Sequence, residues 1–382
     1  MLKDILETIG VKPMINASAT ETVLGGSRMH PEVVKAMAEA SRNFFDIREL
    51  HAAVGKRIAE LTKNKAAMVS GGVASSFYLI SMALIKLTDP DVFEKIPAQP
   101  PKGQSAIVYK SHRVEYVCGI EQAGLELRVI GDVGSNTDPE AELLEKEILR
   151  EKPLFFLYVM AGLWIPPGAP TLESAIRVCK KHRVPLILDA AAQLPPRSNF
   201  WNFTKAGADI VLFSGGKDLQ GPSHTGLVLG DERIVEACRE IISPNEGVGR
   251  FFKIGKEELI AALTAVEMYM KKDEDTRLAW CEAQVDKLIR GLGDLPGITA
   301  ERSFPNEAGQ PVPRVKIGYD QDLYRVSPQD LIRDFKARPV RIAFMPDPGK
   351  GFYCNPMTLG EGESEIIISE IKDYFSTIRG IL

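Results

Sequence analysis

The chain has 382 residues, of which 45% are hydrophobic and 26% are charged, and its formal net charge is −4. This length is ample for a large domain accompanied by a smaller one. The lack of a basic excess argues against a nucleic-acid partner. The five scattered cysteines form no CxxC pair, which argues against a disulfide framework and favours a reducing cytoplasm. The opening residues lack a signal-peptide pattern, and no apolar run reaches transmembrane length.

Short apolar runs alternate with amphipathic stretches through the middle of the chain. The apolar runs predict strands at Ala106–Tyr109, Glu126–Ile130, Leu154–Met160, Pro185–Leu188, Asp209–Phe213 and Leu227–Leu229. Between them, Pro139–Glu151 and Thr171–His182 place apolar residues three and four apart, a spacing that predicts helices. Continuous apolar strands separated by helices predict an α/β fold with a mostly parallel, helix-covered sheet.

The pattern changes on either side of this region. The N-terminal residues 1–50 have no clear place in the main sheet, and the proline-rich stretch Asp89–Gly103 is typical of a loop. A shift in composition near Gly247–Gly255 precedes expected helices at Lys256–Lys272, Glu274–Leu292 and Gly362–Ile378. We therefore expect an N-terminal arm (1–50), a large domain (51–255) and a small α+β domain (256–382).

A glycine-flanked lysine, Lys217, follows the expected strand Asp209–Phe213 in the run FSGGK. Ligands of open α/β sheets bind at the carboxyl ends of the strands. A lysine amine loses its proton when it is desolvated, so it suits Schiff-base chemistry. Ser214, in the same run, offers a hydroxyl for a phosphate oxygen. Taken alone, this motif is weak, because a lysine in a loop is more often a solvated charge.

Asp189 directly follows the expected strand Pro185–Leu188. The next expected strand along the chain is the one that leads to Lys217. A carboxylate at the end of a buried strand is costly unless it is paired. Such a carboxylate suits the protonated ring nitrogen of pyridoxal 5′-phosphate (PLP). One βαβ unit separates Asp189 from Lys217, so both are expected at the same edge of the sheet, and the small Ala190 and Ala191 would let a flat ring lie close. The alternative is that Asp189 is a helix cap or a turn residue.

A glycine-containing turn precedes the helical run FYLISMALIKL. Its residues are Ser70, Gly71, Gly72, Val73 and Ala74, followed by two further serines. Backbone N–H groups at a helix start favour an anion, so this turn is a candidate phosphate cradle. The turn lacks both the P-loop pattern and the dinucleotide-fold pattern. A flexible turn with an N-cap serine is an equally good interpretation.

The histidines offer one further candidate. His112 follows the strand Ala106–Tyr109, where a planar side chain could stack on a cofactor ring or could simply be a hydrogen-bonded loop residue. His30, His51, His182 and His224 show no metal-ligand spacing among themselves, so no metal site is expected.

Several motifs together resemble the aspartate-aminotransferase-like superfamily of PLP enzymes (fold type I). The resemblance is strongest to the selenocysteine synthase-like branch, which includes D-glucosaminate-6-phosphate ammonia-lyase-like proteins. It covers about residues 15–270, in the stretches INASAT, LGGS, IAELTKNKAAMVSGGVAS, LDAAAQLPP, GADIVLFSGGKDLQGPSHTGLVLG and GRFFKIGKEELIAALTAVE. It implies a seven-stranded-type sheet in the large domain.

The resemblance also implies roles for single residues. Lys217 would form the Schiff base with PLP, Asp189 would pair with the ring nitrogen, and His112 would supply the stacking group. Further positions implied to contact the cofactor are Ser70, Gly71, Gly72, Val73, Ala74, Ala191, Gln193 and Ser214. Candidates for a substrate contact or a subunit interface are Arg250, Lys253 and Arg341.

The expected activity is that of a PLP-dependent lyase. It would eliminate a β-substituent from a hydroxylated amino acid or amino sugar acid and release ammonia and a 2-oxo acid. An aminotransferase, a racemase, a β-replacement transferase and a catalytically silent PLP-binding protein are the alternatives. The negative net charge and the short N-terminal stretch argue against a tRNA substrate. A small amine-bearing substrate and a homodimer or higher homo-oligomer are expected, with neither a nucleic-acid nor a membrane partner.

Overall fold

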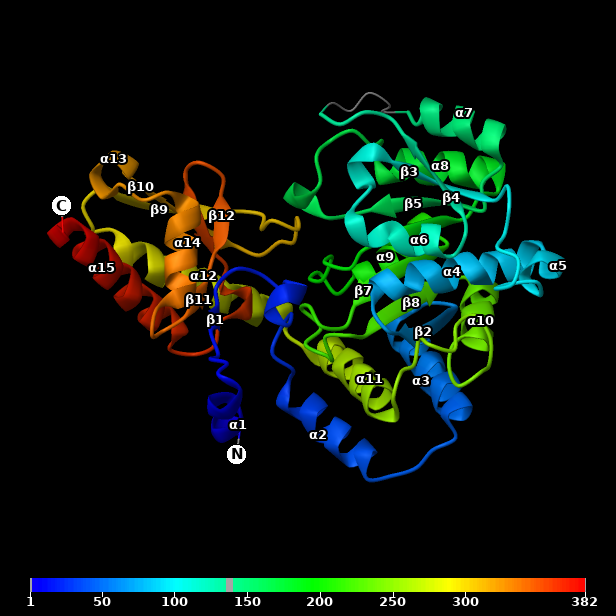
Figure 1. Ribbon diagram of the computed structural model, residues 1–382, viewed down its shortest axis with the longest axis horizontal. Helices are drawn as coiled ribbons and strands as arrows, with labels where there is room; N and C mark the ends of the chain where they lie inside the picture. The colour runs from blue at the N-terminus through cyan, green and yellow to red at the C-terminus, as the bar shows by residue number, and fades with distance from the viewer. Residues whose placement is uncertain (1, 135–139, 382) are drawn as a thin grey trace. The chain divides into compact units, whose positions relative to one another are not determined.

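The computed structural model describes residues 2–134 and 140–381, which form two compact units. The large unit comprises residues 27–272 and 307–310. The other, called here the C-terminal unit, comprises residues 1–26, 273–306 and 311–382. This grouping differs from the three expected segments, because residues 27–50 and the first helix after residue 255 pack with the large unit. Figure 1 shows the elements of both units.

A seven-stranded sheet forms the centre of the large unit, in the order β2-β8-β7-β6-β5-β3-β4. Its strands are β2 (Ala66–Ser70), β3 (Ser105–Tyr109), β4 (Glu126–Ile130), β5 (Phe155–Val159), β6 (Leu186–Asp189), β7 (Ile210–Ser214) and β8 (Gly226–Gly230). All neighbouring pairs are parallel except those that β8 makes with β2 and β7. The α/β fold with a mostly parallel sheet is therefore confirmed. Six strands correspond to the expected ones, and β2 is the additional strand.

Helices cover this sheet, as the α/β pattern requires (Figure 1). They are α2 (Pro31–Ser41), α3 (Ile47–Thr62), α4 (Val73–Thr88), α5 (Pro90–Phe93), α6 (Gly119–Gln122), α7 (Glu142–Glu151), α8 (Leu172–His182), α9 (Asn199–Ala206), α10 (Glu232–Ile241) and α11 (Lys256–Lys271). The expected helix Pro139–Glu151 corresponds to α7, and Pro139 lies outside the described residues. The expected loop Asp89–Gly103 contains the short helix α5.

The core of the large unit is built from the strands of the sheet and the inner faces of its helices. β3, β6 and β7 contribute side chains that are almost completely buried, such as Ile107, Leu188 and Phe213. Parallel strands with helices on both faces bury both sides of the sheet, which explains why their sequences read as continuous apolar runs. This rigid core fixes the strand ends that carry the candidate site.

The C-terminal unit has its own core and a four-stranded antiparallel sheet, in the order β12-β13-β10-β9. The strands of this sheet are β9 (Ile298–Ser303), β10 (Arg314–Tyr319), β12 (Met345–Asp347) and β13 (Gly351–Cys354). A separate parallel pair is formed by β1 (Ile15–Asn16) and β11 (Ile342–Ala343). Its helices are α1 (Leu2–Ile9), α12 (Glu274–Leu292), α13 (Gln321–Tyr324), α14 (Pro328–Ala337) and α15 (Glu363–Ile381). Helices on an antiparallel sheet match the expected α+β class.

Two negative findings apply to the described residues only. No helix among them is both long enough and apolar enough to span a membrane. Within the same ranges, no group of three or more His, Cys, Asp or Glu side chains could hold a metal ion.

Candidate active site

Asp189 and Lys217 lie at the same edge of the large sheet. Asp189 is the last residue of β6, and it pairs in register with Leu212 of the parallel neighbour β7. β7 ends at Ser214, and Lys217 follows three residues later in a turn. The sequence prediction that these two side chains project from one edge is consistent with this topology.

Asp189 is a buried carboxylate with a donor on each oxygen. Only 1% of the residue is exposed. Its Oδ1 accepts from the Ala191 amide at 2.9 Å, and its Oδ2 accepts from the Tyr116 hydroxyl at 3.0 Å. Burial raises the pKa of Asp189, while the Ala191 amide, the charge of Lys217 and the Tyr116 hydroxyl each oppose that rise. The carboxylate of Asp189 is therefore a costly buried charge that its neighbours stabilise.

The Lys217 amine is desolvated in the same region. Burial lowers the pKa of Lys217, and the charges of Asp189 and then Glu307 oppose this shift. A lowered pKa makes the neutral, nucleophilic form of a lysine amine easier to reach. Lys217 thus has the environment that Schiff-base chemistry requires.

The turn that carries Lys217 is held rigidly. The Ser27 hydroxyl donates to the carbonyls of Gly216, at 2.9 Å, and Lys217, at 2.6 Å. A Cβ atom at Gly215 would overlap the Thr225 hydroxyl, and one at Gly216 would overlap the backbone of Ser223. The two glycines of FSGGK are therefore required by close packing of the turn against the segment that leads into β8.

The expected phosphate cradle lies at this same edge. Ser70, which ends β2, and Ser214, which ends β7, flank the same residue of β8, Gly226. Helix α4 starts at Val73, and its N-cap residue, Gly72, has φ = 108° and supplies no side-chain cap. The backbone amides in the first turn of this 16-residue helix therefore make no hydrogen bond to an N-cap side chain. Amides at the start of a helix favour an anion.

The serine hydroxyls of the cradle are used within the turn. The hydroxyl of Ser70 lies 2.7 Å from that of Ser76, and the hydroxyls of Ser75 and Ser76 both donate to the Gly72 carbonyl. These bonds fix the start of α4. Backbone amides, rather than the Ser70 hydroxyl, are therefore the donors that the geometry offers to a phosphate.

His112 is buried next to this edge. Its Nδ1 accepts from the backbone amide of Val159, which pairs in register with Asp189. Its ring packs edge-to-face on Tyr158, with 4.4 Å between the ring centroids. Burial lowers the pKa of His112 to about 4, so the imidazole is neutral at physiological pH. His112 lies level with Asp189, and its stacking on a cofactor stays a prediction.

Gln193 connects the strand edge to a distant piece of the chain. Its amide group donates to the carbonyls of Met160, at 3.1 Å, and Ala308, at 2.9 Å. The Glu307 carbonyl accepts from the Leu163 amide at 2.7 Å. The short segment 307–310 is thereby held against the large unit and brings the buried Glu307 within electrostatic range of Lys217.

The three expected basic residues have contacts of their own. Arg250 donates to the Ser243 hydroxyl at 3.2 Å and lies 3.6 Å from Glu246, while Lys253 is exposed in the same loop of the large unit. Arg341 belongs to the C-terminal unit, where it donates to the carbonyls of Lys336 and Lys12. The contacts described for these three side chains do not join them to Asp189 or Lys217.

Three residues of the site are missing from the sequence-based set. They are Ser27, Tyr116 and Glu307. Tyr116 follows β3 by only a few residues, so its position at a strand end was a usable signal. Ser27 and Glu307 are far from Lys217 in sequence. Ser27 ends the stretch LGGS of the family resemblance, but nothing in that stretch links it to Lys217, and no local pattern distinguishes Glu307.

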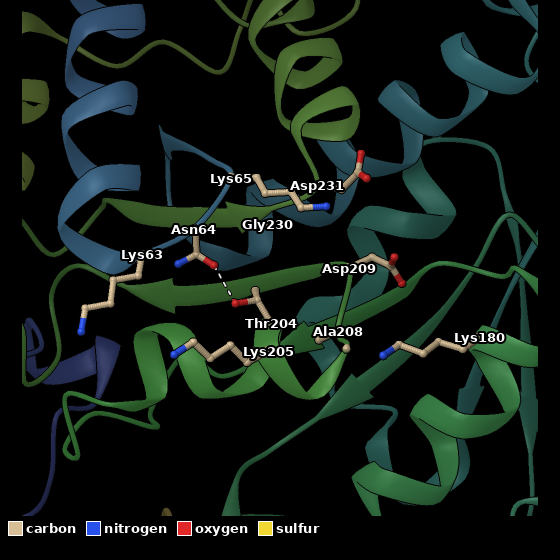
Figure 2. A pocket seen from close by; sticks show the side chains of 11 residues that line it. Lys63, Asn64, Lys65, Lys180, Thr204, Lys205, Ala208, Asp209, Gly230 and Asp231 are labelled. Carbon is tan, nitrogen blue, oxygen red and sulfur yellow. Dashed lines mark hydrogen bonds between the residues drawn. The ribbon is translucent and has the colours of Figure 1, made fainter.

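A separate cavity of about 390 Å³ lies at the opposite end of β7, beside Asp209, which precedes that strand (Figure 2). Four lysines line it, Lys63, Lys65, Lys180 and Lys205. A 2.7 Å hydrogen bond joins Thr204 to Asn64 in its wall. Because Asp209 and Lys217 lie beyond opposite ends of one strand, this cavity is distinct from the Asp189–Lys217 site.

The residues at the Asp189–Lys217 edge suit PLP. A buried carboxylate matches a protonated ring nitrogen, a desolvated lysine amine matches an aldehyde, and the start of α4 matches a phosphate. All three lie at the edge where ligands of open α/β sheets bind. The residues thus match the ring nitrogen, the aldehyde and the phosphate of the cofactor.

Comparisons with known proteins agree with this site. The chain is 25% identical to D-glucosaminate-6-phosphate ammonia lyase of Salmonella typhimurium over 98% of each sequence. It is 28% identical to a 5′-C-glycyluridine monooxygenase-decarboxylase of a Streptomyces species, over 86% of this chain and 84% of that protein. It is also 25% identical to L-seryl-tRNA(Sec) selenium transferase of Desulfotalea psychrophila, over 73% of this chain and 60% of that protein.

Solved structures show the same fold. A structure of D-glucosaminate-6-phosphate ammonia-lyase superimposes with a TM-score of 0.82 at 23% identity and covers 98% of each chain. Ureidoglycine-glyoxylate aminotransferase of Bacillus subtilis superimposes with a TM-score of 0.61 at 14% identity, over 96% of this chain and 94% of that one. No family model matches the chain.

The fold and the site together define a PLP-dependent enzyme of fold type I. Within that class, the chain is similar in sequence to D-glucosaminate-6-phosphate ammonia lyase and to L-seryl-tRNA(Sec) selenium transferase. The resemblance inferred from the sequence motifs is confirmed.

Proposed function

We propose that the chain is a PLP-dependent lyase that removes the amino group of a β-hydroxylated amino acid or amino sugar acid as ammonia and leaves a 2-oxo acid. The observation that carries the proposal is the pairing of Lys217 with the buried Asp189 at one sheet edge. The similarity to an ammonia lyase over 98% of both sequences supports the choice of reaction.

PLP supplies an electron sink that stabilises negative charge at the α-carbon of a bound amino substrate. Lys217 would hold the cofactor through its amine. When it is not bonded to the cofactor, the same amine would take the proton from the α-carbon of the substrate as a general base. Its burial lowers the pKa of the amine and so favours the neutral form that this step needs.

The other residues keep the reacting groups in place. Asp189 would pair with the positive charge on the ring nitrogen, and its own charge is stabilised by the Ala191 amide and the Tyr116 hydroxyl. The amides at the start of α4 and Ser214 would bind the phosphate. His112, Gln193 and Ala191 would line the ring, and the amide of Gln193 already donates to Met160 and Ala308.

The reaction balances without a further reactant except water. The α-carbon loses a proton to Lys217, and the β-carbon loses its hydroxyl group, which takes up a proton and leaves as water. The resulting 2-amino-2-ene product rearranges to an imine after it is released. Water adds to that imine and ammonia departs, which gives the 2-oxo acid.

A second candidate is an oxygen-dependent decarboxylation. The 28% identity to a monooxygenase-decarboxylase over 86% of this chain favours it specifically. Lys217 and Asp189 would take part in the first steps of both reactions. The two reactions then differ in the group that leaves the α-carbon, which is a proton in the lyase and the carboxylate in the decarboxylase. Aminotransferase, racemase and β-replacement activities begin in the same way and stay as alternatives, as does a silent PLP-binding protein.

The test is a product assay on the PLP-loaded protein. D- and L-3-hydroxyamino acids and amino sugar acids, with and without a 6-phosphate, are incubated with and without oxygen. Equal amounts of ammonia and 2-oxo acid without oxygen uptake support the lyase. Carbon dioxide release that requires oxygen supports the second candidate, and a pyridoxamine form that reacts with an added 2-oxo acid supports an aminotransferase.

We also propose that the chain forms a homodimer. Phe44 is 98% exposed, and the loop that carries Arg250 and Lys253 also exposes Phe251. Contiguous exposed apolar side chains are typical of an interaction surface, and Phe44 adjoins the exposed Phe45. Arg250 and Lys253 would then lie at the subunit interface.

A further inference from the structure

Tyr116 links an aromatic pair to the carboxylate of the site. It lies in the short 3-10 helix Glu115–Cys118 after β3. Its hydroxyl donates to Asp189 Oδ2 at 3.0 Å. Its ring is stacked on that of Phe77 from α4, with 6.2 Å between centroids and 11° between planes. The phenol is therefore oriented toward Asp189 from a supported position.

Asp189 needs this donor because it is buried. A carboxylate in an apolar setting stays charged only if hydrogen bonds and opposite charges replace the water it has lost. The Ala191 amide serves one oxygen and the Tyr116 hydroxyl serves the other. The third support is the charge of Lys217.

The three supports differ in how constant they are. The Ala191 amide cannot change its protonation, whereas the Lys217 amine changes its bonding and its charge during the proposed reaction. Burial, and then the charge of Asp189, raise the pKa of Tyr116, so the phenol stays protonated at any working pH. Tyr116 is the side chain that donates to Asp189 Oδ2 throughout.

We propose that Tyr116 is a positioning residue that keeps Asp189 ionised and oriented toward the ring nitrogen of the bound cofactor. This inference rests on the proposed binding of PLP at Asp189 and does not depend on which reaction follows. It predicts that the effect of Tyr116 on binding passes through the ring nitrogen and not through the rest of the cofactor.

The experiment compares two probes on the full chain. One is PLP, and the other is the analogue in which a carbon atom replaces the ring nitrogen. Affinities are measured by equilibrium binding, so no turnover is needed. The wild-type protein should bind PLP more tightly than the analogue, because only PLP offers a protonated nitrogen to Asp189.

Tyr116→Phe removes the hydroxyl and keeps the ring on Phe77. A lost hydrogen bond to a charged group should weaken PLP binding by about tenfold or more. The affinity for the analogue should change by less than about twofold, since the analogue does not use the charge of Asp189. The preference for PLP over the analogue should therefore fall by about the same factor as the PLP affinity.

Tyr158→Phe is the matched control. It also removes a part-buried hydroxyl that donates a 3.0 Å hydrogen bond, in this case to the Pro170 carbonyl. Both affinities should weaken equally in this variant or stay at the wild-type values.

The result that would overturn the inference is an unchanged preference in Tyr116→Phe, whether both affinities fall together or neither falls. If the wild-type protein itself shows no preference for PLP, the pairing of Asp189 with the ring nitrogen is wrong. That outcome differs from an unchanged preference in Tyr116→Phe, which would contradict only the role proposed for Tyr116.

Discussion

Asp189 and Lys217 each oppose the pKa shift that burial causes in the other, although they belong to the ends of different strands. Asp189 ends β6, and Lys217 follows β7 in a turn held by Ser27. Because β6 and β7 are parallel neighbours, their carboxyl ends meet at one edge of the sheet. The topology thus brings together a carboxylate and an amine that lie on either side of one crossover connection.

Lys217→Ala should abolish the yellow Schiff-base absorbance and lower turnover by about 10²–10⁴-fold, since it removes both the anchor and the general base. Absorbance spectra of the PLP-loaded protein and initial rates measure the two effects. Lys205→Ala is the control, because that lysine lines the cavity at the opposite end of β7. Retention of the absorbance band in Lys217→Ala would place the Schiff base on another lysine.

Asp189→Asn should stabilise the cofactor-free protein increasingly as the pH rises. Burial raises the pKa of Asp189 in the folded protein, so the folded protein keeps the proton of this carboxyl to a higher pH than the unfolded chain does. The stability that this proton provides is full below the unfolded-state pKa and is lost as the pH rises through the folded-state value. Urea unfolding of both cofactor-free proteins at pH 5 and pH 8 measures the difference in unfolding free energy. A difference that is independent of pH would show that Asp189 is not desolvated.

His112 should make the protein sensitive to mild acid. Burial lowers its pKa from 6.5 to about 4, so the unfolded chain binds a proton that the folded one does not. The wild-type protein should lose about 2 kcal/mol of stability relative to His112→Asn between pH 7 and pH 5. Asparagine keeps an acceptor for the Val159 amide. Equal losses in the two proteins would indicate that His112 is protonated in the folded state.

Phe44→Asp should shift the protein from dimer toward monomer in sedimentation, because it places a charge on a side chain that is 98% exposed and is proposed to lie in the interface. Leu149→Asp is the matched control, since Leu149 is also an exposed apolar residue of the large unit, on α7. The same sedimentation rate for all three proteins would show that Phe44 does not lie in the interface. A monomeric wild-type protein would contradict the homodimer itself.

The central sheet was largely predictable from the sequence because its strands are buried on both faces. β4 matches the expected range Glu126–Ile130, and five other strands match within one or two residues. β2 was missed because AAMVS is short and contains two alanines, which have weak strand preference. Antiparallel pairing with β8 stabilises this strand where its local strand propensity does not.

The site was predictable where the pattern is local and unpredictable where it is tertiary. Lys217 and Asp189 each follow an apolar strand, so topology alone predicted their shared edge. Ser27 and Glu307 reach that edge through contacts with residues far away in sequence. The Ser27 hydroxyl donates to the Lys217 carbonyl, and the Leu163 amide donates to the Glu307 carbonyl. The expected boundaries differ from the two compact units for the same reason, because α11 packs on α2 and α3 although it follows the shift in composition.

The most direct test of the proposed function is the stoichiometry of products from a β-hydroxylated amino sugar acid. The PLP-loaded protein is incubated without oxygen, and ammonia and 2-oxo acid are quantified together. We expect both to appear in equal amounts, and we expect their rate of formation to fall by about 10²–10⁴-fold with Lys217→Ala. Formation of a 2-oxo acid without ammonia, or turnover only in the presence of oxygen, would contradict it.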